Sequence, residues 1–239
     1  MIEAKRTDHE NRYKDGGYLE SHPTWHEEDS SWKADHILRM LSKQGIAPKR
    51  ICEVGCGAGG ILGQLHVAMP ENVEFDGYEI SPQAYELCRA KTTDRLRFHL
   101  KNITEDCDTH FDVLLMMDVI EHVEDYMGFL KLLRDVASYH CFHIPLDLTV
   151  SSLLRVTPIL RTREREGHIH YFTKEIALAS LQDAGYEILD SFYTHGGIDM
   201  PKQGVTNAAV ALAKKATFSL NQDWAVRIFG GFSLMVLTR

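Results

Sequence analysis

The glycine-rich segment at residues 51–62 constrains the fold of this 239-residue chain more than any other part of the sequence. It reads ICEVGCGAGGIL and places glycines at 55, 57, 59 and 60 directly after the short apolar run 50–54. A backbone that leaves a buried strand, turns sharply and lets a ligand approach its peptide groups needs glycine at such positions. The segment predicts a strand, a glycine turn and a helix. A phosphate group, a nucleoside or no ligand at all could lie at that turn.

Strand-like and helix-like segments alternate on both sides of the glycines. Ala34, Ile37, Leu38 and Leu41 recur at helical spacing, which predicts a first helix from Asp29 onwards. Strands are expected at 50–54, 73–80, 96–103 and 139–145 and within 111–120, with helices between most of them. Apolar strands joined by helices are typical of a parallel sheet covered on both faces. We therefore expect a doubly wound α/β fold.

The alternation breaks after residue 145. A segment of about 146–170 is too long for an ordinary connection, so it is expected to be a helical insertion, and a second insertion is expected at about 196–229. Between them, Thr173 and Gly185 are predicted to cap and stop a helix that leads into a strand at 186–194. A last strand is expected at 232–238. The polar residues 1–28 are interpreted as an N-terminal arm or lid, and 29–239 as one domain capped by the two insertions.

Charge and composition exclude some classes of function. The net charge of −8 argues against a nucleic-acid-binding protein, because neutralising phosphates normally requires a basic face. The five cysteines form no Cys-x-x-Cys pair and are expected to be reduced thiols. No apolar stretch of ~18 residues and no apolar leader occurs. These features predict a cytoplasmic protein without a membrane span.

An acidic residue at the end of the second expected strand narrows the choice of ligand. Glu79 lies 20 residues after Gly59, where a carboxylate can accept hydrogen bonds from both hydroxyls of a ribose. A nucleoside ligand is therefore predicted, with a solvated strand-end acid as the alternative. Gly55, Gly57 and Gly60 also satisfy the Gly-x-Gly-x-x-Gly spacing of dinucleotide-binding proteins, so the spacing alone leaves NAD open.

Four segments together carry a resemblance to a known family. EVGCGAGG at 53–60, YEIS at 78–81, DVIEHVED at 118–125 and GHIHYFTKEIALASLQDAGYEI at 167–188 resemble the class I S-adenosylmethionine-dependent methyltransferases. The likeness is greatest to the small-molecule group that includes quinone-biosynthesis enzymes, and it covers roughly residues 30–195 and the last strand. It implies a Rossmann-like, seven-stranded sheet with an antiparallel last strand. It also implies methyl transfer from S-adenosylmethionine to a small or medium-sized molecule.

The resemblance assigns cofactor-binding residues. Glu53 and the loop from Gly55 to Gly59 correspond to residues that hold the methionine end of the cofactor, and Glu79 corresponds to the ribose-binding acid. Asn102 and Ile103 correspond to the adenine side. The family often has Asp where this chain has Asn102, but an amide still donates and accepts hydrogen bonds there. The complete expected set is Glu53, Gly55, Cys56, Gly57, Gly59, Glu79, Ile80, Asn102, Ile103, Met117 and Asp118.

The reaction implied by the resemblance depends mainly on alignment. Methyl transfer from a sulfonium needs no covalent intermediate, and positioning of this kind can supply ~7–11 kcal/mol. Ligands of open α/β sheets bind beyond the carboxyl ends of the strands, which points to Met117, Asp118 and the loop with Glu121 and His122. His122 is the candidate general base, because its ordinary pKa of about 6.5 suits proton removal near neutrality. The alternative is a structural histidine.

Further histidines are candidates for the wall of an acceptor pocket. His143 lies within an apolar strand, where a core histidine is the alternative. His168 and His170 fall on one side of residues 167–172 if these are extended. Such a pair could bind a metal, but no third ligand stands at a fixed spacing, so no metal is expected. The expected substrate-binding residues are His143, His168, His170 and Tyr171.

Two other groups of side chains allow more than one interpretation. Four arginines in the first insertion could neutralise an acidic substrate or form a solvated face: Arg155, Arg161, Arg163 and Arg165. Trp25, His26 and Trp32 precede the glycine loop and could fold over the cofactor, although Trp32 could equally lie in the core.

Three other functions are compatible with parts of the sequence. An NAD-dependent oxidoreductase would need a second nucleotide-binding half, which the pattern after the fifth strand does not provide. A nucleic-acid methyltransferase is disfavoured by the acidic charge. A non-catalytic regulator that binds S-adenosylmethionine would have the same glycine loop. The identity of the acceptor and the oligomeric state do not follow from the sequence.

Overall fold

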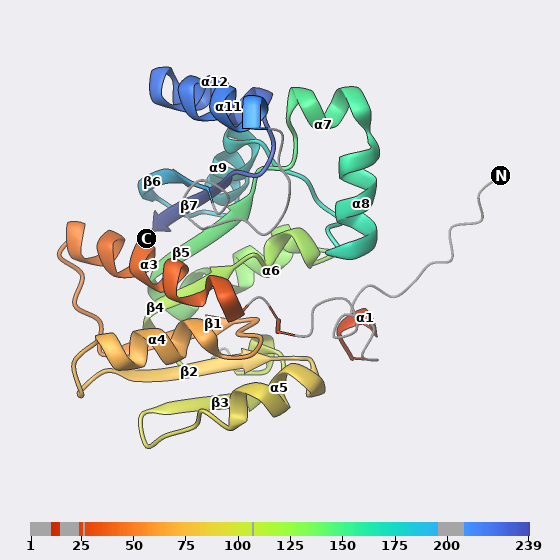
Figure 1. Ribbon diagram of the computed structural model, residues 1–239. Coiled ribbons are helices and arrows are strands. Elements are labelled where there is room, and N and C mark those ends of the chain that lie inside the picture. The colour runs from red at the N-terminus through yellow and green to blue at the C-terminus, as the bar shows by residue number, and fades with distance from the viewer. Residues whose placement is uncertain (1–10, 15–23, 26, 107, 196–207) are drawn as a thin grey trace.

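A seven-stranded sheet forms the centre of the molecule (Figure 1). The computed structural model describes residues 11–14, 24–25, 27–106, 108–195 and 208–239. Within these residues the strands lie in the order β3-β2-β1-β4-β5-β7-β6. Their bounds are Arg50–Val54 (β1), Glu74–Glu79 (β2), Leu96–Leu100 (β3), Phe111–Met117 (β4), Ala137–Pro145 (β5), Ile188–Thr194 (β6) and Ser233–Thr238 (β7).

The first five strands are parallel to one another, and β7 is antiparallel to both β5 and β6. The predicted doubly wound sheet with an antiparallel last strand is therefore confirmed. From β1 the chain first builds β2 and β3 on one side and then returns to build β4 and β5 on the other. Such a reversal of strand order opens a crevice at the carboxyl ends of β1 and β4, where ligands of open α/β sheets bind.

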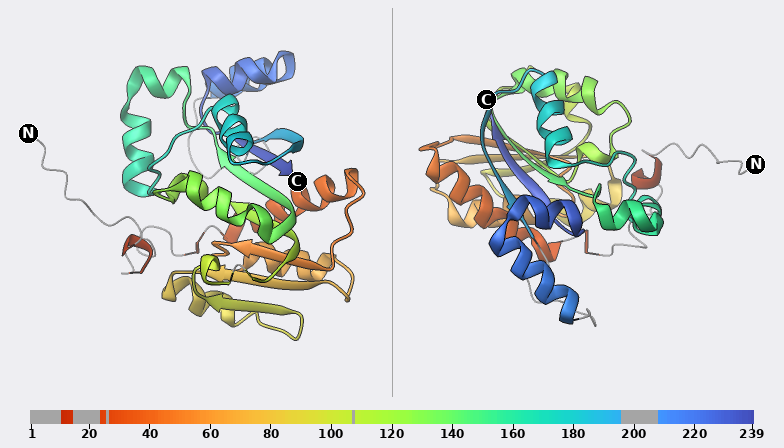
Figure 2. Two further views of the ribbon diagram at one scale, coloured as in Figure 1. Left: turned by 180° about the vertical axis from the view of Figure 1, so that it is seen from behind. Right: turned by 90° about the horizontal axis from the view of Figure 1, so that it is seen from above.

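Helices cover both faces of the sheet, as Figures 1 and 2 show from opposite sides. Side chains of one helical group share a core with Ile51, Phe75 and Leu115, and this group is α3 (Ser30–Lys43), α4 (Gly60–Ala68) and α5 (Pro82–Arg89). The opposite group shares a core with Val54 and Phe142, and it is α6 (Tyr126–Leu133), α9 (Lys174–Asp183) and α12 (Gln222–Ile228). Neighbouring residues of each strand thus point to different cores, as the pleat requires.

The remaining described helices lie outside these two layers or join elements of the sheet. The α-helices are α1 (Asn11–Lys14), α7 (Val150–Arg155), α8 (Thr157–Arg165) and α11 (Ala208–Leu220). The 3₁₀ turns are η1 (Glu27–Asp29), η2 (Ile103–Glu105), η3 (Ile120–His122) and η4 (Arg134–Val136). Among the described residues, no helix is both long enough and apolar enough to cross a membrane.

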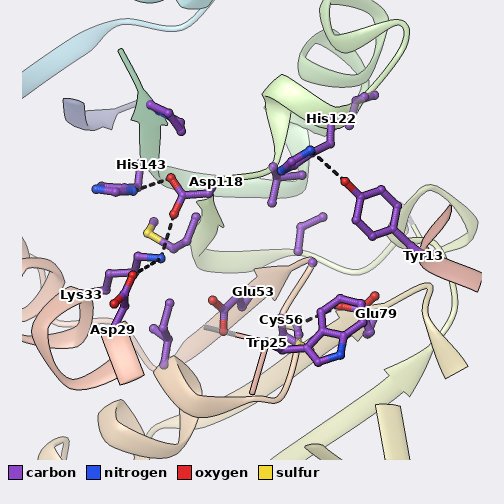
Figure 3. A pocket seen from close by; sticks show the side chains of 18 of the residues that line it. Tyr13, Trp25, Asp29, Lys33, Glu53, Cys56, Glu79, Asp118, His122 and His143 are labelled. Carbon is purple, nitrogen blue, oxygen red and sulfur yellow. Dashed lines mark hydrogen bonds and ion pairs between the residues drawn. The ribbon is translucent and has the colours of Figure 1, made fainter. Parts of the chain in front are cut away.

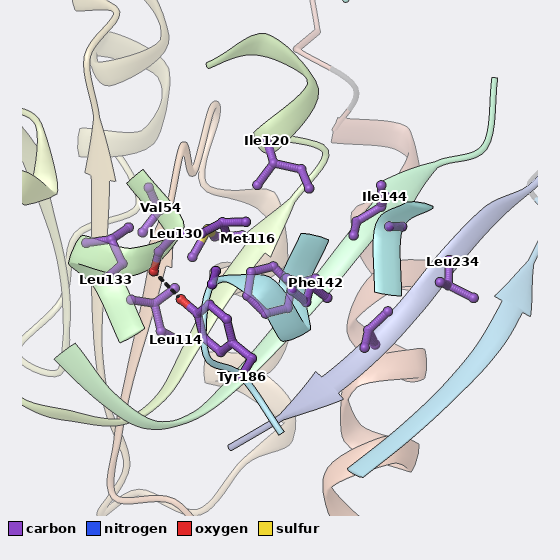
Figure 4. Packing of buried hydrophobic residues seen from close by; sticks show 14 of the residues in the cluster. Val54, Leu114, Met116, Ile120, Leu130, Leu133, Phe142, Ile144, Tyr186 and Leu234 are labelled. Carbon is purple, nitrogen blue, oxygen red and sulfur yellow. Dashed lines mark hydrogen bonds between the residues drawn. The ribbon is translucent and has the colours of Figure 1, made fainter. Parts of the chain in front are cut away.

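The core under α6 anchors the strands that end at the crevice (Figure 4). Val54 of β1 and Met116 of β4 belong to the same buried cluster as Leu130 and Leu133 of α6. The Tyr186 hydroxyl is also buried there and donates a hydrogen bond to the Leu130 carbonyl at 2.8 Å. This contact ties the connection between α9 and β6 to α6, so strand ends and helices are held by one cluster.

Local signals set several helix ends, among them the predicted cap at Thr173. Ser81 caps α5 by accepting a hydrogen bond from the Ala84 backbone N–H at 3.3 Å. Thr173 caps α9 in the same way through the Ile176 N–H at 3.3 Å. Both insertions contain helices, α7 and α8 in the first and α11 and α12 in the second, while residues 196–207 lie outside the described ranges.

The third strand is shorter than predicted. The strand expected at 96–103 ends at Leu100, because Asn102 caps the next turn by accepting a hydrogen bond from the Thr104 N–H at 3.1 Å. The strand expected within 111–120 is present and ends at Met117, because Asp118 has a φ of 57°, which a strand cannot contain. Both strand ends place polar side chains at the carboxyl edge of the sheet.

We expect Asp76→Asn to weaken the sheet next to the crevice. Although burial raises the pKa of Asp76, hydrogen bonds from His99 and Arg97 lower it overall from 3.8 to about 2. A depressed folded-state pKa stabilises the protein above about pH 4, and this stabilisation is lost as the pH falls towards 2. Asp76→Asn should therefore cost about 2 kcal/mol at pH 7 and about half as much at pH 3.

Urea unfolding of both proteins between pH 7 and pH 3 measures this difference. Asp94→Asn, at an exposed position on the turn before β3, is the matched control and should leave stability unchanged at every pH. A cost for Asp76→Asn that stays constant with pH would contradict the electrostatic explanation.

Candidate functional site

A cavity of about 710 Å³ lies at the crevice (Figure 3). It is lined by the carboxyl ends of β1, β2, β4 and β5, by the glycine loop, and by residues of η1, α3 and η3. Its size and its mixture of apolar and charged walls suit a small-molecule ligand or cofactor. The cavity therefore occupies the position where the strand order predicts a binding site.

The glycines after β1 have two separate functions. Gly57 has a φ of 54° and lines the cavity, so a side chain there would be strained. Gly59 also has a positive φ, but a Cβ at this position would lie 2.7 Å from the Phe98 ring and 2.9 Å from Cys88 Cβ. Gly59 is therefore required by packing between the loop and the sheet. It does not line the cavity, in contrast to its predicted role in cofactor binding.

Glu79 holds the glycine loop against the end of β2. One carboxylate oxygen accepts a hydrogen bond from the Gly57 N–H at 2.8 Å, and the other accepts from Ile80 at 2.9 Å and Ser81 at 2.8 Å. Burial raises the pKa of Glu79, while these backbone N–H groups favour its charged form. The carboxylate lines the cavity, so it fixes the loop and also faces a bound ligand.

Glu53 is a buried acid with unused hydrogen-bonding capacity. It is 2% exposed, and Oε2 has no hydrogen-bond partner among the described residues. Burial raises the pKa of Glu53 to about 8, with Lys33 opposing the increase and Glu79 adding to it. A buried polar oxygen without a partner is costly, and here it lies on the wall of the cavity. A ligand that brings a cation or a hydrogen-bond donor would satisfy it.

Asp118 forms a charged group with Lys33 and His143 on another side of the cavity (Figure 3). Lys33 Nζ lies 2.8 Å from Asp118 Oδ2, and His143 Nδ1 lies 2.6 Å from Oδ1. Although burial raises the pKa of Asp118, His143 and Lys33 hold it well below its usual range. His143 Nε2 also contacts Thr194 Oγ1 at 2.8 Å. His143 therefore lines the cavity with both nitrogens occupied, and is not an isolated core histidine.

His122 also lines the cavity, but its surroundings disfavour a role as general base. Its Nδ1 lies 2.9 Å from the Tyr13 hydroxyl and 3.2 Å from the Gly167 carbonyl. Burial, together with the nearby His168, lowers the pKa of His122 to about 3. A group with so low a pKa accepts a proton poorly at neutral pH.

Most residues predicted to contact a ligand meet at this one cavity. Those that line it are Glu53, Gly55, Cys56, Gly57, Glu79, Ile80, Asn102, Ile103, Met117, Asp118, His122, His143 and His168. Trp25 and Trp32 line it as well, whereas His26 lies outside the described residues. The four arginines of the first insertion are exposed and do not line it, in agreement with a solvated face.

His170 and Tyr171 do not reach the cavity, contrary to prediction. Residues 167–172 form no strand, so the expected alternation of side chains fails. His170 Nε2 instead lies 2.9 Å from the Val123 carbonyl, and the Tyr171 hydroxyl donates to the His168 carbonyl at 3.0 Å. Both side chains hold the connection between α8 and α9 in place.

Lys33 and Tyr13 are among the cavity residues that were not predicted. Lys33 lies four residues before Ile37 on the apolar stripe of the first helix, and a lysine inside such a stripe is the signal that could have revealed it. Tyr13 belongs to the N-terminal arm and contacts His122 from a position 109 residues away in sequence. No local pattern marks a contact between segments so far apart.

Comparisons with known proteins agree with this arrangement. A family model described as a methyltransferase domain matches residues 25–191. Proteins named ubiquinone biosynthesis O-methyltransferase from Hydrogenovibrio crunogenus and Pseudomonas aeruginosa are 29% and 26% identical over 114 and 111 residues. These matches cover 43% and 42% of this chain and 46% and 47% of the relatives. The chain thus spans about half the length of the curated relatives it matches.

Solved structures share the fold at lower sequence identity. Magnesium protoporphyrin IX methyltransferase from Synechocystis PCC 6803 with bound SAH has a TM-score of 0.58 at 16% identity, covering 87% of this chain and 83% of that one. An N-methyltransferase from Bradyrhizobium japonicum WM9 in complex with S-adenosyl-L-homocysteine has a TM-score of 0.55 at 15% identity, with coverages of 87% and 85%. At these identities the likeness concerns the fold.

We expect Asp118→Asn to destabilise the protein by about 3 kcal/mol, because it leaves the buried Lys33 ammonium without its nearest counter-charge. Asparagine tolerates a positive φ, so the change removes charge without forcing the backbone. Urea unfolding at pH 7 measures the loss. The double variant Lys33→Met/Asp118→Asn should lose less than Asp118→Asn alone. An equal or larger loss in the double variant would show that the ion pair does not control stability here.

Proposed function

This chain belongs to the family of methyltransferase domains, and we propose that it transfers the methyl group of S-adenosylmethionine to a small or medium-sized molecule. The observation that carries the proposal is the unpartnered Glu53 oxygen beside the glycine loop, in the same cavity as Glu79. S-adenosylmethionine carries an amino-acid ammonium and a ribose with two hydroxyls. The ammonium matches Glu53, which has an oxygen without a partner, and the ribose hydroxyls match Glu79 at the end of the neighbouring strand.

The cavity fits the proposed cofactor along its length. Glu53 would accept hydrogen bonds from the ammonium, and the Gly57 backbone would allow close approach of the methionine end. Glu79 would accept from the ribose hydroxyls, and Asn102 and Ile103 would border the adenine. All five residues line the same cavity, which supports their assignment to one ligand.

The protein's own contribution to the reaction would be to bind, align and exclude water. When bound, S-adenosylmethionine supplies an electrophilic methyl group on a sulfonium. Met117, Phe129 and Phe232 give the cavity an apolar wall, and holding two reactants in line within it can supply ~7–11 kcal/mol. His122, with a pKa of about 3, would remain neutral and border the acceptor without removing its proton.

A small-molecule acceptor and a cytoplasmic location are part of the same proposal. The curated relatives are named as enzymes of ubiquinone biosynthesis, which supports a small acceptor. The net charge of −8 disfavours nucleic acid as the acceptor. Cys52, Cys56, Cys88 and Cys141 are buried free thiols, as expected in a reducing compartment. An NAD-dependent oxidoreductase is not favoured, because antiparallel β7 follows β5 where a second nucleotide-binding half would continue the parallel sheet.

Calorimetric titration with S-adenosylmethionine, S-adenosylhomocysteine and NAD⁺ tests the proposal. We expect the first two ligands to bind and NAD⁺ not to bind. Glu79→Ala should weaken binding by roughly 1.5–3 kcal/mol, the value of hydrogen bonds to a charged group. Glu86→Ala, at an exposed acid on α5 that is paired only with Arg89, is the matched control and should bind like the parent protein.

Two results would overturn the assignment. Binding of NAD⁺ alone would favour the dinucleotide interpretation of the glycine spacing. Unchanged affinity of a folded Glu79→Ala variant would remove Glu79 from the ligand site, with circular dichroism as the check on folding.

Cofactor affinity should increase with pH through Glu53. In the free protein the pKa of Glu53 is about 8, so the carboxyl is protonated at pH 7 and must lose its proton to pair with an ammonium. Binding then releases a proton, and the dissociation constant should fall about tenfold per pH unit up to pH 8. Titrations between pH 6 and pH 8, in buffers of different ionisation enthalpy, measure both effects. Glu53→Gln should abolish this slope and the proton release; the same slope in both proteins would assign it to another group.

A further inference from the structure

Three potential metal ligands converge beside the cavity from two separate segments. Glu121 and His122 belong to η3 after β4, and His168 lies in the connection between α8 and α9. His122 Nε2 is 3.9 Å from Glu121 Oε1, and His168 Nε2 is 4.0 Å from the same oxygen. One ligand atom from each residue lies within 4.8 Å of the others. The imidazoles of His122 and His168 therefore both lie next to the Glu121 carboxylate.

The Glu121 carboxylate shows that this group is incomplete. Its residue is 0% exposed, and neither oxygen accepts a hydrogen bond from any other described residue. A carboxylate without donors in such a position loses its hydration and gains nothing in return, so buried acids are normally paired or bound to a metal. The described neighbours that approach the oxygens are the two imidazoles, which have no fixed positive charge.

Both histidines are oriented with Nε2 towards the carboxylate. His168 Nδ1 lies 2.7 Å from Asp147 Oδ2, so its Nδ1–H donates to that carboxylate. His122 Nδ1 lies 3.2 Å from the Gly167 carbonyl, which can only accept, and 2.9 Å from the Tyr13 hydroxyl, which can accept as well as donate. Donation from Nδ1–H to the carbonyl gives His122 the same tautomer. In both rings Nε2 is then left with a lone pair. A ring whose distal N–H is held by a carboxylate or a carbonyl is the usual arrangement of a metal-binding histidine.

We propose that Glu121, His122 and His168 bind one divalent transition-metal ion, such as Zn²⁺, in the wall of the cavity. Two imidazole nitrogens and one carboxylate oxygen suit Zn²⁺, Co²⁺ or Ni²⁺ better than Mg²⁺ or Ca²⁺, which prefer oxygen ligands alone. Ligand atoms around Zn²⁺ lie ~3.3 Å apart, so small rotations of the two rings would close the spacing observed here.

The position of the site gives the ion access to the cavity. His122 and His168 line the cavity, whereas Glu121 is buried behind them. An ion bound by these two histidines would therefore lie at the edge of the cavity, within reach of an oxygen of the methyl acceptor. That last step rests on the proposed function, but the metal site itself does not. This metal site is not the His168–His170 pair that the sequence suggested, because His170 contacts backbone carbonyls instead.

Cobalt spectroscopy on chelator-treated, tag-free protein tests the proposal. We expect Co²⁺ to produce visible d–d absorption that saturates at one equivalent and is displaced by Zn²⁺. Glu121→Gln and His168→Ala should abolish this signal. Asp147→Asn, which weakens the support of His168, should lower Zn²⁺ affinity about 10–100-fold. His110→Ala is the matched control, at an exposed histidine before β4 that is outside the cluster, and should keep the parent spectrum and affinity.

Thermal melting separates loss of the site from loss of the fold. Without metal, Glu121→Gln should melt no lower than the parent protein, because it replaces an unpartnered buried carboxyl, whose pKa is raised by burial, with a neutral amide of similar shape. Zn²⁺ should raise the melting temperature of the parent and of His110→Ala, but not that of Glu121→Gln. Absence of saturable binding, or equal binding by His168→Ala, would overturn the proposal. Neither measurement uses S-adenosylmethionine, so a failed metal site and a failed methyltransferase assignment give different results.

Discussion

At the carboxyl edge of the sheet, Glu79 accepts hydrogen bonds from three backbone N–H groups and so connects the end of β2 to the glycine loop of β1. The cavity depends on this contact, because the loop forms its floor. The charge of the Asp118 carboxylate is instead compensated by side chains, those of Lys33 and His143. Two other acids at this edge, Glu53 and Glu121, have oxygens that no other described residue satisfies. The acids that hold the site together, Glu79 and Asp118, thus have partners within the folded chain, whereas Glu53 and Glu121 keep oxygens that a ligand would satisfy.

The sequence was sufficient for the fold because the signals are local. Ser81 and Pro82 begin α5 and Thr173 begins α9, where capping depends on residues within one helical turn. The strand predicted at 96–103 was too long, because Asn102 ends it early. The strand within 111–120 ends before Asp118, which takes a positive φ and whose carboxylate contacts Lys33 and His143, and neither of these contacts is near it in sequence. A pattern of apolar residues cannot show such a tertiary constraint.

Only those residues of the candidate site that lie at strand ends could be predicted from the sequence. Glu53 and Glu79 could be identified because each lies at a fixed distance from the glycines. His168 was identified, but with His170 as its neighbour, because an extended segment was assumed where the structure has an irregular connection. Its actual neighbours are Glu121 and His122, about 46 residues earlier. Their meeting depends on the path of the first insertion, which no motif specifies.

The two acids without hydrogen-bond partners, Glu53 and Glu121, suit two different ligands of one cavity. Glu53 adjoins the glycine loop and faces the part of the cavity that suits an amino-acid cation, whereas Glu121 lies behind His122 at the end of β4. A histidine with a pKa of about 3 is a poor proton acceptor but a good neutral ligand, because an imidazole must be unprotonated to bind a metal. The burial that disfavours His122 as a general base therefore suits it to metal binding. A bound cation would then favour the deprotonated form of the acceptor electrostatically, and the proton would pass to solvent without a side-chain base.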